Sequence, residues 1–175
     1  MPVKIVIADD HDVVRQGLRT ILRARPEWEI SAEAANGKEA VEAVQSVAPD
    51  VLILDITMPV MSGLDAMREI GRLDVATRVL IFTMHDSSSL VRAVKEAGAQ
   101  GYVLKSNAAR DLIKAIEALL GGDTFFGPGS GTSEQQPKKD AGLSLRAAMP
   151  YFENARESNS LKLPAANPYF DPKRG

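Results

Sequence analysis

The sequence predicts an α/β protein, built as a doubly wound, five-stranded parallel sheet with helices on both faces. Four short runs are almost wholly apolar, which is typical of strands that helices cover on both sides. Between these runs, apolar residues recur at steps of three and four, which is the period of an α-helix. Strands and helices thus alternate along the chain, and this alternation with short connections favours one parallel sheet with right-handed crossovers.

The expected strands differ in how they are covered. The four apolar runs are Val3–Ala8, Val51–Leu54, residues 79–82 and Gly101–Leu104. Residues 28–33 instead alternate apolar and polar side chains, a pattern typical of a half-exposed strand at the edge of a sheet. An edge position for this second strand favours the strand order 2-1-3-4-5.

Five amphipathic stretches are expected to form the helices, within residues 13–22, 40–47, 64–73, 90–97 and 112–120. Ser87 stands where the N-cap of the fourth helix is expected, and Gly98 stands where that helix should end. Gly121 and Gly122 are placed to end the fifth helix in the same way.

Composition excludes several classes of protein. The chain has 175 residues, of which 45% are hydrophobic and 25% are charged, with a formal net charge of −2 and no cysteine. The lack of cysteine excludes disulfides, thiolate zinc sites and a cysteine nucleophile. No apolar run approaches the roughly 18 residues of a membrane-spanning helix, and the start does not resemble a secretory signal. We therefore expect a soluble, cytoplasmic protein without a membrane partner.

The composition changes near residue 121. Residues 123–175 hold six of the ten prolines and contain no isoleucine or valine. Such a segment can bury little apolar surface, and this does not offset the entropy cost of ordering its backbone. We therefore expect one folded domain over residues 1–122, followed by a linker and a Pro-rich, largely disordered tail over residues 123–175.

Polar residues follow the apolar runs. Asp9 and Asp10 follow the first run, Asp55 the third strand, Thr83 the fourth and Lys105 the fifth. Each of these residues, taken alone, is explained by a turn, a helix cap or a solvated charge. Because they follow four parallel strands, which end at the same edge of the sheet, together they favour a shared site there. Three acids so close repel one another unless a cation holds them ionised, and the oxygen ligands suit Mg²⁺. With two histidines and no thiol, the sequence argues against zinc.

These residues resemble a known family, the receiver domain of bacterial two-component response regulators, which has a flavodoxin-like or CheY-like fold. The resemblance covers about residues 3–121, and residues 9–18 and 83–86 are most similar to its NarL/FixJ branch. Three positions depart from the family pattern: Val60 and Ser62 replace a common glycine and aspartate in the loop after Asp55, and Ser106 replaces a common proline after Lys105. The resemblance rests on Asp9, Asp10, Asp55, Met58, Pro59, Gly63, Thr83 and residues 101–105.

The resemblance implies a phosphorelay chemistry. Asp55 would accept a phosphoryl group from a sensor histidine kinase, in a domain that only phosphorylates and dephosphorylates itself and is not an enzyme for other substrates. Asp10 and Asp55 would bind Mg²⁺ directly, with the backbone carbonyl of Thr57 as a third ligand and Asp9 acting mainly through water. A phosphorylation-linked homodimer stays open.

The resemblance also implies a switch. Lys105 would pair with one phosphoryl oxygen, while the Thr83 hydroxyl would bond another and move toward the phosphate. Tyr102 would then rotate into the space behind Thr83 and reshape the surface of the fourth helix and fifth strand. From the sequence, Tyr102 is equally well explained as a half-buried aromatic side chain of a strand.

Residues 123–175 do not show which output function follows the receiver-like part. NarL-like receivers usually continue through a linker into a helix-turn-helix DNA-binding domain, and residues 127–133 resemble such a linker. The prolines after residue 146 leave no long helical period, so we expect no intact helix-turn-helix domain and no DNA binding by this chain. The repeated Pro-Tyr-Phe-acid sequence at 150–153 and 168–171 is either a docking motif for a protein partner or a product of biased composition.

Two other functions are compatible with parts of the sequence. The first is a DNA-binding transcription regulator with a shortened or degenerate output region. The second is a haloacid-dehalogenase-type phosphatase, which also uses an aspartate at a strand end. That phosphatase family has a second acid two positions later, where this chain has Thr57, so the sequence disfavours it.

Overall fold

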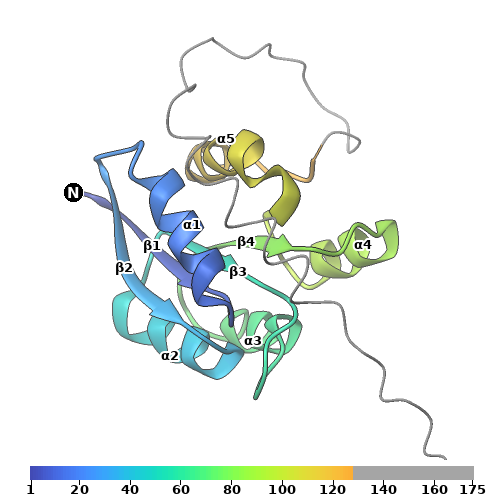
Figure 1. Ribbon diagram of the computed structural model, residues 1–175. Coiled ribbons are helices and arrows are strands. Elements are labelled where there is room, and N and C mark those ends of the chain that lie inside the picture. The colour runs from blue at the N-terminus through green and yellow to red at the C-terminus, as the bar shows by residue number, and fades with distance from the viewer. Residues whose placement is uncertain (128–175) are drawn as a thin grey trace, which may run out of the picture.

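A computed structural model of the chain describes residues 1–127, and the predictions made for residues 128–175 lie outside them. The described part is a three-layered α/β fold around one parallel sheet (Figure 1). Its strand order, β2-β1-β3-β4-β5, confirms the predicted order and the edge position of the second strand. The strands are β1 (Val3–Ala8), β2 (Trp28–Ala34), β3 (Val51–Leu54), β4 (Arg78–Thr83) and β5 (Gly101–Leu104).

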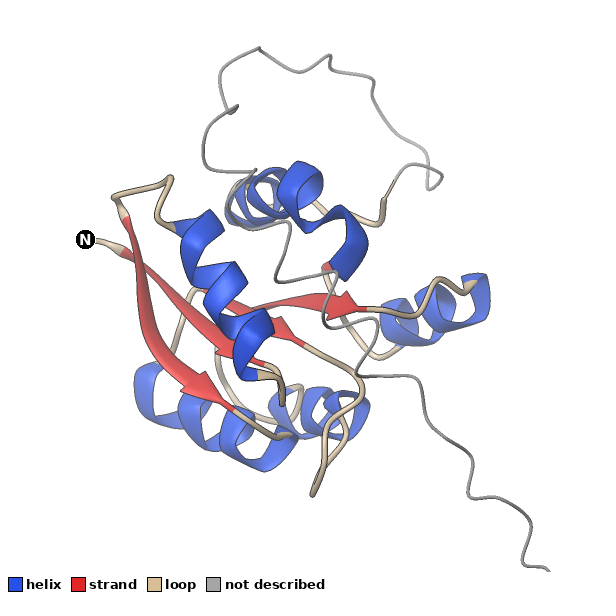
Figure 2. Ribbon diagram, viewed as in Figure 1, coloured by secondary structure: helices blue, strands red, loops and turns tan. Residues whose placement is uncertain are grey.

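Helices cover both faces of the sheet (Figure 2). Helices α1 and α5 contribute to one buried apolar cluster, and α2, α3 and α4 contribute to the other. A short 3₁₀ turn, η1 (Lys105–Asn107), leads from β5 into α5. The helices are α1 (Asp12–Leu22), α2 (Gly37–Val47), α3 (Gly63–Ile70), α4 (Ser88–Glu96) and α5 (Ala108–Leu120).

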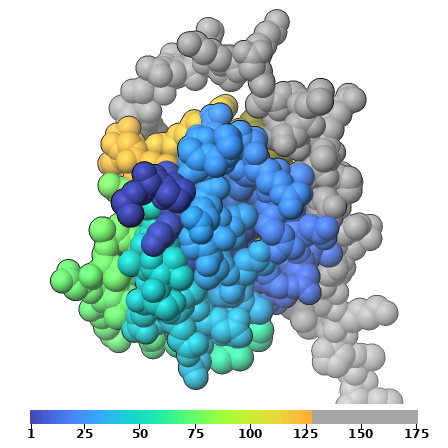
Figure 3. Space-filling model, turned by 90° about the vertical axis from the view of Figure 1, so that its left-hand side faces the viewer, coloured from blue at the N-terminus to red at the C-terminus, as the bar shows by residue number. Residues whose placement is uncertain are grey.

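The central strands are buried on both sides because their side chains alternate between two cores. In β1, Ile5 and Ile7 belong to the cluster under α1 and α5, whereas Val6 and Ala8 belong to the cluster under α2, α3 and α4. The outer strand β2 is only partly covered, and from its side the surface is formed largely by the N-terminal part of the chain (Figure 3). This explains why the β1 sequence is largely apolar while the β2 sequence alternates.

Glycines end two helices as the sequence predicted. Gly98 has φ +96° and Gly122 has φ +92°, so both adopt the left-handed conformation that glycine tolerates best. After α4, Ala99 N–H donates to Val94 O, and after α5, Asp123 N–H donates to Ala118 O. These bonds satisfy carbonyls that would otherwise be left without partners at the helix ends.

The helix starts show where sequence reasoning was incomplete. Ser87 is the N-cap of α4, as predicted, but its hydroxyl bonds that of Ser89 and not the helix backbone. Helix α3 begins with a true side-chain cap, because Ser62 Oγ accepts from Asp65 N–H at 3.2 Å. This helix ends at Ile70, three residues before the predicted end at Leu73, and Leu73 packs against the core from the following turn.

The described chain runs five residues past the predicted boundary at 122. Residues 123–127 lie along the outer edge of β5, where Gly101 and Phe125 form a parallel bridge. Phe125 and Phe126 are partly buried against the two apolar clusters. The domain division at residue 122 remains a prediction, but apolar packing clearly continues beyond it.

Candidate functional site

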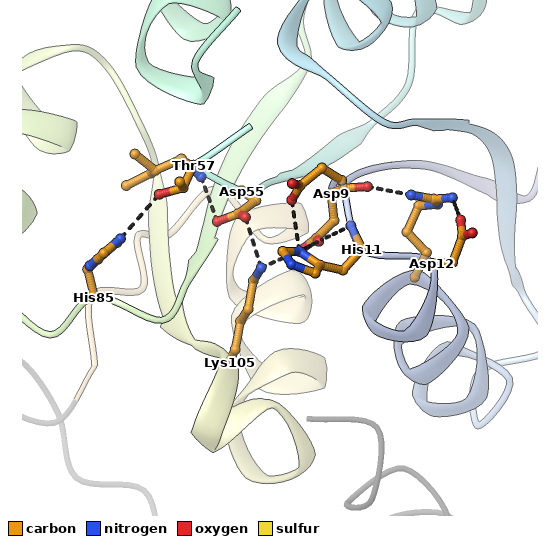
Figure 4. Close-up of polar contacts among 10 residues, drawn as sticks. Asp9, His11, Asp12, Asp55, Thr57, His85 and Lys105 are labelled. Atoms are coloured by element: carbon orange, nitrogen blue, oxygen red, sulfur yellow. Dashed lines mark hydrogen bonds and ion pairs between the residues drawn. The ribbon is translucent and has the colours of Figure 1, made fainter. Parts of the chain in front are cut away.

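The parallel direction of the strands brings two acids and one lysine together. Asp9 follows β1, Asp55 follows β3, and Lys105 follows β5. Lys105 Nζ lies 2.6 Å from Asp9 Oδ2 and 2.9 Å from Asp55 Oδ2 (Figure 4). All three side chains are buried, with exposed fractions of 1%, 3% and 2% for Asp9, Asp55 and Lys105. The site is therefore a compact buried ion cluster at the carboxyl edge of the sheet.

The charges of this cluster perturb one another. Burial raises the pKa of Asp55, the attraction of Lys105 opposes this rise, and the repulsion of Asp9 adds to it. Burial would lower the pKa of Lys105, but the two carboxylates more than compensate and raise it. Lys105 is consequently a firmly charged ammonium group, while the ionised form of Asp55 is disfavoured without a further cation.

Asp10, the second acid after β1, contacts His11. It is exposed, and its Oδ1 lies 2.8 Å from His11 Nδ1. The backbone N–H of His11 donates to Asp9 Oδ1 at 3.0 Å, so His11 contacts both acids of the pair. Arg15 also fixes this loop, because its guanidinium donates to the backbone oxygen of Asp9.

The acidic loop offers donors that suit a divalent cation. Ligand atoms of Asp9, Asp10 and His11 all lie within 4.8 Å of one another. The carboxylates of Asp9 and Asp10 suit a hard cation that prefers oxygen ligands. The carboxylate of Asp55 is close by, because Lys105 Nζ contacts both Asp9 and Asp55. Sequence reasoning missed His11, although its position directly after the two acids was an available signal.

A second histidine, His85, contacts Thr83, Thr57 and Tyr102. The Thr83 hydroxyl is fully buried and accepts from His85 N–H at 3.2 Å. The His85 ring contacts the Thr57 hydroxyl, with 3.1 Å between Nε2 and Oγ1 (Figure 4). Tyr102 donates its hydroxyl to the backbone oxygen of His85. Through His85, the three residues form one connected group beside Asp55.

Tyr102 is buried, with an exposed fraction of 4%, rather than half-exposed at the surface of its strand. Burial raises the pKa of its hydroxyl, and the nearby carboxylate of Asp86 raises it further. The hydroxyl is therefore a protonated donor at neutral pH, as its bond to His85 requires.

The loop after Asp55 is tightly folded onto the strand. Ile56 N–H donates to Asp55 Oδ1 at 2.8 Å, and Gly63 N–H donates to Ile56 O at 2.9 Å. A Cβ atom at Gly63 would lie 2.0 Å from Asp55 O, so only glycine allows α3 to start this close to the site. Val60 has φ +66° and is 82% exposed, which places a β-branched residue in a conformation that usually requires glycine.

The fold and the site together define a class of protein. A five-stranded parallel sheet of order 2-1-3-4-5, with two buried acids and a lysine at its carboxyl edge, is the architecture of a receiver-type signalling domain. The model of the response regulator receiver domain family matches residues 5–117 of this chain. The chain therefore belongs to the response regulator receiver domain family, a family of signalling domains, as the sequence resemblance predicted.

Known relatives support this assignment. The chain is 38% identical to the transcriptional regulatory protein DegU of Brevibacillus brevis over 126 residues, which are 72% of this chain and 53% of DegU. It is 42% identical to the oxygen regulatory protein NreC of Staphylococcus carnosus over 132 residues, which are 75% of this chain and 61% of NreC. The crystal structure of a LuxR-family two-component response regulator from Aurantimonas sp. matches with a TM-score of 0.70 and 41% identity, covering 73% of this chain and 91% of that one.

The matches to the curated relatives cover only part of those proteins. The chain spans between half and two thirds of the length of these curated relatives. The similarity to NreC, and to the nitrate/nitrite response regulator NarP of Escherichia coli at 38% identity, agrees with the predicted NarL-like branch. Within residues 1–127, no helix has the length and apolar character needed to cross a bilayer.

Proposed function

We propose that this chain is the phosphoacceptor of a phosphorelay, and that Asp55 takes the phosphoryl group from a sensor histidine kinase in the presence of Mg²⁺. The observation that carries the proposal is the pairing of Lys105 Nζ with both Asp55 and Asp9 inside the buried edge of the sheet. A carboxylate held beside a fixed ammonium group can act as a nucleophile toward phosphorus while the developing charge is neutralised. The expected location of such a protein is the cytoplasm.

The transfer can be written with this chain's residues. One carboxylate oxygen of Asp55 attacks phosphorus, the bond from phosphorus to the histidine nitrogen breaks, and the leaving imidazole keeps the electron pair and takes up a proton. Lys105 stays charged and moves its contact from Asp55 Oδ2 to a phosphoryl oxygen. Little acid–base chemistry is needed, because phosphoryl transfer depends mainly on positioning and charge neutralisation.

The acids of the site would hold the metal. Asp10, Asp55 and the backbone carbonyl of Thr57 are proposed as direct ligands, with Asp9 acting mainly through water. When bound, Mg²⁺ would neutralise oxygens of the transferred group. The raised pKa of Asp55 supports this assignment, because an additional cation is what would favour its ionised form.

The proposed output is a change in protein contacts. Thr83 would leave His85 N–H and bond a phosphoryl oxygen, and Tyr102 would leave His85 O and turn toward the vacated space. The surface of α4 and β5 would change as a result. Homodimerisation through a changed surface remains a proposal.

The test is incubation with acetyl phosphate and Mg²⁺ followed by intact mass measurement. The wild type should gain one acid-stable, base-labile phosphoryl group, and both a chelator and Asp55→Asn should abolish it. Asp74→Asn is the matched control, because Asp74 is an exposed acid away from the site. A label that persists on Asp55→Asn would refute the assignment.

DNA binding is a second candidate, since the DegU relative is named a transcriptional regulatory protein. Titration of a DNA duplex at several salt concentrations tests it, because phosphate contacts make affinity fall with salt. The expected result is no binding even at low salt.

A further inference from the structure

Residues 123–127, which we call the strap, close the free edge of the sheet. Phe125 N–H donates to Gln100 O at 3.0 Å, and Phe125 O accepts from Tyr102 N–H at 2.6 Å. The strap thereby supplies partners to backbone groups of β5, which otherwise pairs only with β4 among the described residues. Gly122, in the left-handed conformation, turns the chain from α5 back toward this edge.

The two aromatic residues of the strap anchor it to opposite faces of the sheet. Phe125 packs against the cluster under α1 and α5. Phe126 packs against the other cluster, which contains Tyr102, and Lys95 Nζ of α4 lies 4.2 Å from the centre of its ring. Successive side chains of an extended segment point to opposite sides, so one short stretch can hold both faces.

The strap is therefore fixed to the surface that the proposed switch would change. It bonds the backbone of Tyr102 directly, and it contacts α4 through Lys95. Tyr102 in turn is tied to His85, which binds the Thr83 hydroxyl. A continuous chain of contacts leads from Thr83, beside Asp55, to residues 123–127.

We propose that the strap is an autoinhibitory contact, docked on β5 and α4 while Tyr102 and Thr83 are held by His85, and released when Asp55 is phosphorylated. This inference rests on the proposed function. Release would free the edge of β5, at Gln100 O and Tyr102 N–H, together with the seat of Phe126. The chain after α5 would thus report the state of Asp55 without any contact to it.

The strap and the phosphoryl group must affect each other equally, because coupling between two sites is reciprocal. If phosphorylation weakens strap docking by some factor, then a docked strap disfavours occupation of Asp55 by that same factor, relative to an undocked strap. The interaction of Lys95 with Phe126 is the contact to weaken, because both partners lie at the surface of the fold and neither belongs to the phosphorylation site.

Amide hydrogen exchange tests the release. The full chain is compared in Mg²⁺ alone and in Mg²⁺ with beryllofluoride, a phosphoryl mimic, and exchange is followed at the Phe125 and Tyr102 amides. We expect both amides to exchange about tenfold faster with beryllofluoride, a change within the usual range of coupling between sites. The Asp50 amide, which donates to Lys4 O elsewhere in the fold, should not change. Unchanged or slower exchange at Phe125 and Tyr102 would overturn the proposal.

A pair of substitutions tests the reciprocal effect. Lys95→Gln should raise the affinity for beryllofluoride about two- to five-fold, the range of an exposed cation–π contact. Arg92→Gln removes an exposed charge one turn earlier on α4 and should leave the affinity unchanged. Equal affinities of the wild type and Lys95→Gln for beryllofluoride would contradict the proposed coupling between the strap and Asp55. A wild type that takes up neither beryllofluoride nor phosphate would instead refute the proposed function itself.

Discussion

Lys105 holds its ammonium nitrogen between two buried carboxylates, and this arrangement sets the charge balance of the site. Its pKa is raised above the ordinary 10.5, so the stabilisation that it gives is complete at neutral pH and is lost only in strongly alkaline solution. Asp55 has the opposite effect: its raised pKa means that its charge opposes folding at neutral pH. The residue proposed to react is thus also the one whose ionisation destabilises the fold.

This balance predicts the effect of Asp55→Asn on stability. Without Mg²⁺ at pH 7, the free energy of unfolding should rise by about 1 kcal/mol, because a neutral amide replaces a buried charge that is repelled by Asp9. Ionisation of Asp55 lowers the free energy of unfolding of the wild type as pH rises from 3.8 through the raised pKa of Asp55. The difference in free energy of unfolding between Asp55→Asn and the wild type should therefore grow over this pH range and then level off. Urea unfolding at several pH values measures this difference. If Asp55→Asn is less stable than the wild type at pH 7, the charge of Asp55 does not destabilise the fold.

At the scale of elements, the start of α3 is positioned by close backbone approach. Gly63 lets the helix begin against Asp55 O, and Ser62 caps the helix in the preceding position. The carboxylate of Asp65 accepts from the Ser62 hydroxyl and from Arg68, and these bonds lower its pKa. The loop that carries Thr57 is therefore held at both ends, by β3 and by the first turn of α3.

Gly63→Ala should therefore destabilise the fold by about 3 kcal/mol or more, since its Cβ would lie 2.0 Å from Asp55 O and backbone cannot easily move away. Phosphorylation by acetyl phosphate should also slow, because the Asp55 backbone would shift. Gly71→Ala is the matched control: Gly71 has helical φ −63°, and its Cβ would meet the nearest atom at 3.4 Å. Chemical unfolding and intact mass follow both effects, and equal behaviour of the two variants would contradict this role of Gly63.

At the scale of the whole molecule, the sheet is completed at its two edges in different ways. The β2 edge is half-exposed, and charged side chains on it pair with α1, as in the contacts of Glu33 with Arg15 and Arg19. The β5 edge is covered by the strap, which supplies apolar side chains to both clusters. The folded unit therefore depends on residues that follow its last helix.

This dependence makes the end of the domain measurable. A chain ended after residue 122 should unfold with a free energy about 2 kcal/mol lower than one ended after residue 127, because two partly buried phenylalanines are lost. The chain ended after residue 127 should match the full-length chain in urea unfolding. Equal stability of the two shortened chains would instead support the predicted boundary at residue 122.

Much of the fold and part of the site could be predicted because both follow from local patterns. Largely apolar runs marked β1, β3 and β5 with their observed bounds, and the alternating pattern of β2 identified the edge. Strand direction then grouped Asp9, Asp55 and Lys105, since parallel strands end at the same side. The contacts of His11 and His85 could not be predicted in this way, because they are made partly by backbone groups, whose partners the residue type does not specify.

The sequence by itself determined the order of elements, the fold family and the residues at the strand ends, because periodicity and chain direction are written into residue order. Only the tertiary structure decided that Lys105 bridges both acids, that His85 connects Thr83 with Tyr102, and that Phe125 and Phe126 cover β5. The physical reason is the separation of the contacting residues along the chain. Those contacts join segments far apart in the chain, and their strength comes from distances and burial that exist only after the layers have packed.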